Sequence, residues 1–228
     1  ARLGTYILSA GYVYITGAEL VQKFEDRNTD LAPRIARALR IAHSKAGVEA
    51  LLDKLKYPDR EVKTECARAL GEIGDTRAVH PLMDELALTR DTRVTAALAE
   101  ALGRLREASA IYRILPVLRE TANPLLRHAL RVSVGEMLGE RDEFYRIMAD
   151  ERASRGAQLP RLLRRFNREM RRAERKLKVD FSGLRTDMER MPELYETEEL
   201  DAASRLLFDA GVRLAQLRFG IAACDNVD

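Results

Sequence analysis

The sequence predicts an all-α protein, a right-handed α-solenoid of stacked helix pairs followed by a helical C-terminal extension. Three observations predict it. Apolar residues recur three and four apart, a Gly-Asp turn interrupts that pattern, and the whole unit returns every 31 to 32 residues. Helix pairs of this kind cannot bury their apolar faces alone, so consecutive copies must stack on one another.

The clearest unit covers residues 61–91, which read EVKTECARALGEIGDTRAVHPLMDELALTRD, with the turn at residues 71–75. A step of 32 residues carries Leu70 to Leu102, and a second step reaches Val134. The glycines that recur at this step, and that we expect at equivalent corners, are Gly71, Gly103 and Gly135. The residues expected to cap the first helix of successive repeats are Asp59, Asp91 and Asn123.

These repeats predict three parts of the chain. Residues 1–148 form a solenoid of about five repeats, of which the first is eroded. Residues 149–180 hold a linker and a basic amphipathic helix, and residues 181–228 hold the C-terminal helices.

Both ends of the chain depart from the repeat. In the eroded first repeat we expect a helix over residues 2–10, a loop over residues 11–15 and a second helix capped by Thr16. Near the C-terminus, Ser182 is expected to cap a helix that stops close to Met191 and Pro192, and Thr197 to start a longer one.

The basic amphipathic helix is expected over residues 159–178. Nine basic residues stand there against two acidic ones, a local net charge of +7 within a chain of net charge +3. Three interpretations remain open: contact with anionic lipid, contact with nucleic-acid phosphate, or an apolar stripe that caps the end of the solenoid while the arginines stay solvated. The arginines proposed to make the lipid or nucleic-acid contact are Arg161, Arg164, Arg165, Arg168, Arg171, Arg172 and Arg175.

Composition limits the class of protein. With 46% hydrophobic and 33% charged residues, the chain suits a folded helical protein and not a disordered one. Two cysteines cannot supply a disulfide framework, and Cys66 stands on an apolar stripe, where we expect a buried free thiol. We therefore expect a cytoplasmic location, with membrane association as an open alternative.

Residues 61–82 resemble the short HEAT repeats first named for phycobilisome lyases, which carry A-x-A-L-G-x-I-G-D followed by A-V-x-x-L. Residues 123–148 resemble the closing repeat of the cytoplasmic HEAT domain appended to some bacterial major facilitator transporters. The first resemblance implies a repeat scaffold that binds a protein partner, and the second implies the cytoplasmic domain of a larger membrane protein. The lyase relatives imply an alternative, a bilin-lyase-like chaperone or enzyme.

No catalytic residue, cofactor or metal site is predicted. The chain lacks a Gly-rich phosphate loop and a nucleophile elbow. The HEAT-repeat hydroxylases use paired His-Glu steps to bind iron, whereas here Ser44, Pro81 and Ala129 follow the three histidines. The favoured function is therefore a non-catalytic protein-interaction or regulatory module.

In HEAT stacks the second helices line the concave side, and that resemblance places a candidate binding surface. A row of acidic and polar groups there would receive a basic peptide, although an ordinary solvated helix face carries similar residues. The residues proposed to bind a protein or peptide partner are Glu49, Asp53, His80, Asp84 and Tyr112.

Overall fold

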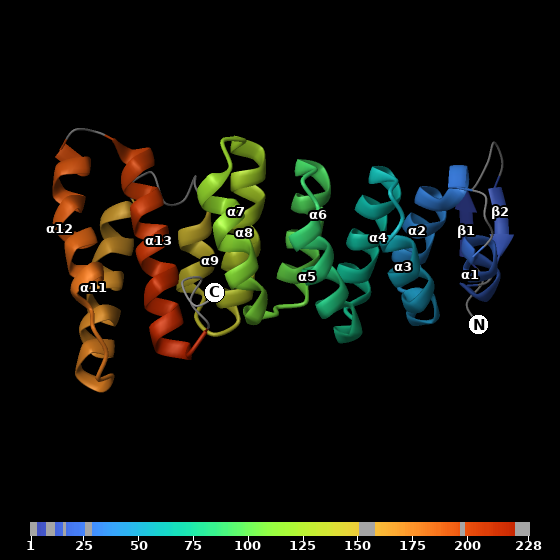
Figure 1. Cartoon of the computed structure of the whole chain (residues 1–228). Coiled ribbons are helices and arrows are strands. Elements are labelled where there is room, and N and C mark those ends of the chain that lie inside the picture. The colour runs from blue at the N-terminus through green and yellow to red at the C-terminus, as the bar shows by residue number, and fades with distance from the viewer. Residues whose placement is uncertain are drawn as a thin grey trace.

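The computed structural model describes residues 4–7, 12–15, 17–25, 29–150, 158–196 and 199–221. Its helices stand side by side in one row, which runs from an N-terminal hairpin to α12 at the opposite end (Figure 1). Apart from that hairpin, all regular elements in the described residues are helical, and the predicted all-α solenoid is confirmed.

Four helix pairs make up the middle of the row. They are α2 (Ala32–Ile41) with α3 (Val48–Leu55), α4 (Arg60–Ile73) with α5 (Val79–Leu88), α6 (Thr92–Arg104) with α7 (Ile111–Glu120), and α8 (Pro124–Gly139) with α9 (Phe144–Ala149). Short 3-10 turns are η1 (Thr29–Leu31), η2 (Lys45–Gly47), η3 (Thr76–Ala78) and η4 (Ala108–Ala110). The last three of these turns join the helices within a pair, one repeat apart each time.

The N-terminal repeat is eroded further than the sequence predicts. Strands β1 (Gly4–Ile7) and β2 (Tyr12–Ile15) form an antiparallel hairpin, so the expected helix over residues 2–10 and loop over residues 11–15 were wrong. Both strands are rich in β-branched and aromatic residues, which favour an extended backbone. The expected second helix is present as α1 (Gly17–Glu25), while Thr16 lies outside the described residues.

The predicted N-caps are confirmed at all three positions. The Asp59 side chain accepts a hydrogen bond of 2.8 Å from the amide of Val62. Asp91 and Asn123 each accept from two amides, at 2.9 and 3.0 Å for Asp91 and at 3.0 and 3.2 Å for Asn123. Each cap satisfies backbone donors that the first turn of a helix leaves free. The chain therefore turns at the same place in each repeat.

The left-handed corners within the pairs do not fall on the three predicted glycines, although Gly74 lies in the turn predicted over residues 71–75. His43, Gly74 and Arg106 have left-handed backbones, with φ of 45°, 74° and 55°, and they are spaced by the repeat length. Each follows the end of a first helix, where this conformation closes the last turn. The place of His43 in the repeat therefore explains its left-handed backbone.

Gly71 and Gly103 lie inside first helices and not at the corners. A Cβ on Gly71 would stand 2.6 Å from the Cα of Ala101, and one on Gly103 would stand 3.1 Å from the Cα of Ser133. These glycines let the first helices of consecutive repeats approach closely. Gly135 has no following repeat and instead faces Ala149 of α9. Two of the three glycines thus have equivalent surroundings.

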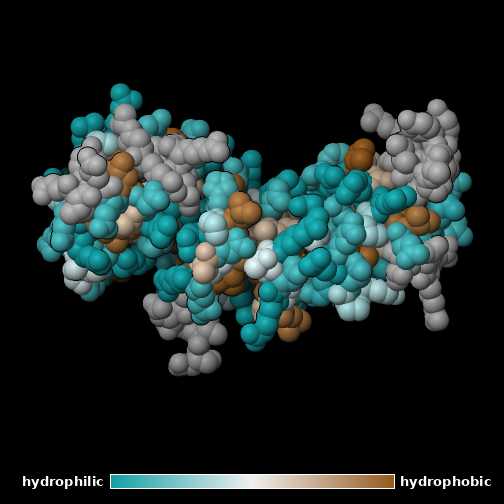
Figure 2. All heavy atoms as spheres, turned by 90° about the horizontal axis from the view of Figure 1, so that it is seen from above, coloured by the Kyte–Doolittle hydropathy of each residue, from teal (hydrophilic) through white to brown (hydrophobic). Residues whose placement is uncertain are grey.

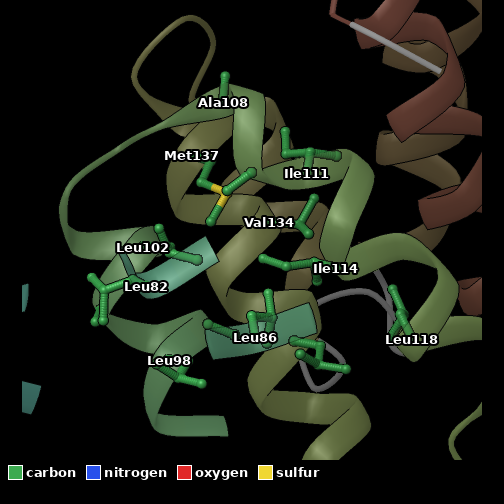
Figure 3. Packing of buried hydrophobic residues seen from close by; sticks show 14 of the residues in the cluster. Leu82, Leu86, Leu98, Leu102, Ala108, Ile111, Ile114, Leu118, Val134 and Met137 are labelled. Atoms are coloured by element: carbon green, nitrogen blue, oxygen red, sulfur yellow. The ribbon is translucent and has the colours of Figure 1, made fainter. Parts of the chain in front are cut away.

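The core is continuous along the row. Helices α4 and α6 each pack between the first helices of the neighbouring repeats and against the second helix of the preceding repeat. Figure 3 shows the result for two repeats, where Leu82, Leu102, Ile114 and Val134 converge from α5, α6, α7 and α8. Cys66 is fully buried as expected, and this burial raises the pKa of its thiol.

Three helices continue the row beyond α9: α11 (Leu159–Lys176), α12 (Ser182–Glu196) and α13 (Leu200–Phe219). Helix α13 packs against α9, α11 and α12, with Gly211 seated against Met148. The predicted end of α12 near Met191 was wrong, because the helix continues through Pro192 to Glu196. Within the described residues none of the helices is both long and apolar enough to cross a bilayer.

Candidate partner-binding surfaces

Equivalent positions on successive second helices carry the predicted partner-binding residues. Glu49 on α3, His80 on α5 and Tyr112 on α7 occupy them, and Asp53 and Asp84 follow one turn later on α3 and α5. All except Tyr112 are exposed, and Tyr112 is partly buried.

This set of partner-binding residues is less acidic than the sequence alone suggests. Arg77 Nη1 lies 2.5 Å from Glu49 Oε1, and Arg77 Nη2 lies 2.8 Å from Asp75 Oδ2. Hydrogen bonds from Arg77 lower the pKa of Asp75 to about 2. Lys56 Nζ, from the residue that follows α3, lies 3.4 Å from Asp53 Oδ1. A basic partner would therefore compete with Arg77 for Glu49, whereas Asp53 and Asp84 present exposed carboxylates.

A groove opens beside Tyr112, between the end of α5, helix α7 and the first turns of α6 and α8. Its volume is about 710 Å³. The residues that line it are Leu86, Ala87, Leu88, Thr89, Arg90, Thr92, Thr95, Tyr112, Arg113, Pro116, Val117, Glu120, Thr121 and Leu126. Tyr112 is the one predicted partner-binding residue among them. The candidate binding surface is therefore centred closer to α7 than the sequence predicts.

The groove combines hydrophobic walls with charged residues. Leu88, at the end of α5, has 76% of its surface exposed, an unusual state for a leucine in a packed repeat. On the opposite wall, Arg113 Nε donates a hydrogen bond of 3.0 Å to Tyr112 Oη, and its guanidinium group lies 5.0 Å from the ring centre. Figure 2 shows one largely hydrophilic face on which hydrophobic patches are small and separate.

The basic helix α11 is docked on the fold through its apolar stripe. Leu159, Leu162, Phe166, Met170 and Ala173 are buried. This burial favours the interpretation of α11 as a cap, since the stripe that would enter a bilayer is already covered.

The predicted arginines divide into two groups. Arg165 Nη2 lies 2.8 Å from Asp142 Oδ1, and the Arg165 guanidinium lies 4.9 Å from the Phe144 ring, so Arg165 ties α11 to the last repeat. Arg172 forms an ion pair of 3.3 Å with Glu169 on α11 itself. The members of the predicted set that are exposed are Arg161, Arg164, Arg168, Arg171, Arg172 and Arg175. They form a basic surface, and its contact with lipid or nucleic acid stays a prediction.

Sequence reasoning missed two features. The first is the groove, because its lining comes from four helices and the loops between them and follows no single stripe. The second is Arg131, which is 2% exposed. A signal for Arg131 does exist: the repeat places it level with Ala67 and Ala99, which are both fully buried. An arginine at a buried alanine position marks a local change of environment.

Among the residues that the structure describes, no group of three or more His, Cys, Asp or Glu side chains is arranged to hold a metal ion. The arrangement described above supports binding surfaces: a groove lined by α5, α6, α7 and α8, exposed carboxylates on α3 and α5, and a basic face on α11.

Comparisons with known proteins agree with this fold. A profile of HEAT repeats matches residues 17–102 and residues 50–135, which together span more than half of the chain. The chain is similar to one in a solved structure, that of the complex of CpcE and CpcF of phycocyanin lyase from Nostoc sp. PCC7120. The TM-score is 0.54 and the identity 15%, over 97% of this chain and 100% of that one. A search of curated proteins gave no significant match.

The expected resemblance to short, lyase-type HEAT repeats is thereby confirmed, while the resemblance to the transporter domain stays a prediction. The repeat profile, the recurring caps and the stacked first helices lead to one conclusion: the chain belongs to the HEAT-repeat family.

Proposed function

We propose that the chain is a non-catalytic protein-interaction module that binds a segment of a partner protein in the groove beside Tyr112. The groove itself carries the proposal, because it joins partly buried apolar walls to an exposed leucine on the second helices. Apolar anchors that fill such pockets supply most of the binding energy in protein interfaces.

The charges around the groove indicate the partner's chemistry. Asp84 and Leu88 stand four residues apart on α5 and therefore share one face of that helix. Asp53 is exposed on the neighbouring α3. We expect the partner segment to place an apolar side chain in the groove and basic side chains over Asp84 and Asp53.

Selection from a displayed peptide library tests this function. Peptides selected on the wild-type chain should share an apolar anchor and flanking basic residues. Their affinity should fall about tenfold or more for Tyr112→Ala, as for a central interface residue, and should fall again for Asp84→Asn. Arg93→Gln on α6, exposed and outside the groove, is the matched control and should bind normally. Selected peptides that bind the Tyr112 variant as tightly as the wild type would contradict the proposal.

A second candidate function is that of a bilin-lyase-like chaperone or enzyme. The similarity to a chain of the phycocyanin lyase complex favours it, as does the fact that the similar chain is matched along its whole length. That structure contains two different proteins, so a lyase-like role also includes a protein partner. Incubation with phycobilin and apo-phycocyanin tests it. Covalent bilin attachment above the uncatalysed rate would support the lyase role, and its absence, with and without a co-expressed partner chain, would exclude it.

A further inference from the structure

A small pocket at the junction between the last repeats and the C-terminal extension is lined by arginines. Its volume is about 240 Å³. Arg119 comes from α7, Arg127 and Arg131 come from α8, and Arg205 comes from α13. A single acidic residue, Asp209 of α13, is in the lining. The lining therefore carries four positive charges against one negative charge.

Arg131 is the deeply buried arginine of this lining. It is 2% exposed, and its Nη2 donates to the backbone oxygen of Met148 at 3.1 Å and to Ser204 Oγ at 3.3 Å. Its guanidinium lies 4.6 Å from the ring centre of Phe208, which also lines the pocket. The side chain is thus held in one orientation by groups from α9 and α13. A fixed, buried guanidinium is a preorganised donor for an anion.

The other arginines of the lining are more accessible to solvent. Arg119 and Arg205 are exposed, and Arg127 is partly buried with its Nη2 donating to the backbone oxygen of Thr121 at 2.6 Å. Asp209 is also exposed. Desolvation raises the pKa of Asp209, while the charges of Arg131, Arg213 and Arg119 act in the opposite direction, and Arg213 is itself engaged by Asp187. Asp209 therefore offsets only part of the positive charge of the lining.

We infer that this arginine pocket is a binding site for a small oxyanion, either a phosphate group or a compact dicarboxylate. Guanidinium groups match the geometry of both with paired hydrogen bonds. The volume is several times that of a water molecule, about 30 Å³ in the liquid, so an anion fits together with some of its waters. None of the residues lining the groove beside Tyr112 also lines this pocket, so this site is independent of the proposed function.

The position of the pocket gives the anion a structural effect. Its arginines come from the last two repeats on one side and from α13 on the other. A bound anion would hold α13 against the solenoid, and because it binds the folded chain, it would also stabilise it. The repeat pattern supports a dedicated role for Arg131, since alanine fills the equivalent buried position in the two preceding repeats.

Calorimetric titration of the full chain with inorganic phosphate, and separately with malonate, tests the site at constant ionic strength set by sodium chloride. We expect saturable binding of at least one of the two anions and a rise in the thermal midpoint. Arg205→Gln and Arg119→Gln should each weaken binding by about tenfold, as expected for loss of a charged hydrogen bond. Asp209→Asn should strengthen it, because the competing carboxylate is removed.

Arg190→Gln is the matched control. It removes one positive charge from an exposed position on α12, outside the pocket, and should leave binding unchanged. All these positions are exposed, so the variants should fold. Equal stabilisation by sodium chloride, or an equal loss of affinity in Arg190→Gln and Arg205→Gln, would overturn the inference. The preferred anion identifies the chemical class of the natural ligand.

Discussion

Gly71 of α4 lies directly against Ala101 of α6, so closely that a Cβ on the glycine would stand 2.6 Å from the Ala101 Cα and 2.8 Å from its Cβ. The contact joins the first helices of consecutive repeats, and Gly103 makes the equivalent contact with Ser133. Close contact between the backbones of consecutive first helices therefore sets the spacing between repeats.

Gly71→Ala is the first prediction that follows. The added methyl group meets the backbone of Ala101, which cannot move aside without separating the two repeats. We expect the free energy of unfolding to fall by about 1–3 kcal/mol, in spite of the better helix propensity of alanine. Urea unfolding measures it. Gly183→Ala on α12 is the control, since its nearest neighbour is the end of Arg213 at 3.7 Å. A Gly71 variant as stable as the control would contradict close stacking.

Substitutions at the equivalent corners Gly74 and Arg106 should change stability in opposite directions. Gly74→Ala should destabilise the chain by about 1–2 kcal/mol, because an L-residue is strained at a φ of 74°. Arg106→Gly should stabilise it by about 0.5–1 kcal/mol, since it relieves the same strain at a φ of 55° and costs some backbone entropy. Thermal unfolding of both variants checks the pair. If the two changes shifted stability in the same direction, the equivalence of the corners would be wrong.

Glu65 makes the contact between α2 and α4 dependent on pH. Burial alone raises the pKa of Glu65, but the hydrogen bond and charge of Arg37, with Arg68 and Arg40, outweigh it and hold the pKa below its ordinary value of 4.5. Arg37 Nη2 and Arg68 Nη1 each lie 3.2 Å from Glu65 Oε1. The carboxylate therefore stabilises the fold above pH 4.5, and this contribution is lost as the pH falls through the lowered pKa.

Glu65→Gln should accordingly cost about 1.5–3 kcal/mol at pH 7, and the difference from the wild type should shrink below pH 4.5. Denaturant unfolding at a series of pH values gives the comparison. Asp53→Asn, which removes one member of an exposed pair with Lys56, should change stability by less than about 1 kcal/mol. A Glu65 difference that stays constant down to pH 3 would show that the charge does not matter.

Phe166 tests whether α11 caps the solenoid. Its side chain is fully buried, and Phe166→Ala should cost about 3–5 kcal/mol and loosen the C-terminal helices first. Arg168→Ala on the exposed side of α11 should stay within about 0.5 kcal/mol. Hydrogen exchange resolves where protection is lost. Unchanged protection of α11 in the Phe166 variant would contradict its role as a cap and would favour membrane contact by its apolar stripe.

Sequence periodicity predicted the parts of the fold that repeat. Asp59, Asp91 and Asn123 could be identified as caps because each precedes a stripe at the same step. The hairpin was missed, although the run from Tyr12 to Ile15 carries residues that favour strands. The hairpin differs from the repeat, so the repeat period could not be used to predict it.

The candidate sites depend on contacts that no period encodes. The arginine pocket brings Arg131 to Ser204, 73 residues further along the chain. Nothing in the sequence of α13 predicts which side of the solenoid it meets. The groove beside Tyr112 is lined by residues of α5, α6, α7 and α8 and of the loops between them, a grouping that only the packed helices create. Sequence reasoning therefore placed Tyr112 on the correct helix but not in the groove.

Small-angle X-ray scattering of the full chain tests the central claim most directly: the helix pairs form one extended row, which α11, α12 and α13 continue (Figure 1). A compact domain of this length would have a radius of gyration of about 17 Å. We predict a clearly larger radius and a distance distribution with a long tail. A radius near that of a compact domain, with a symmetric distribution, would contradict the stacked arrangement.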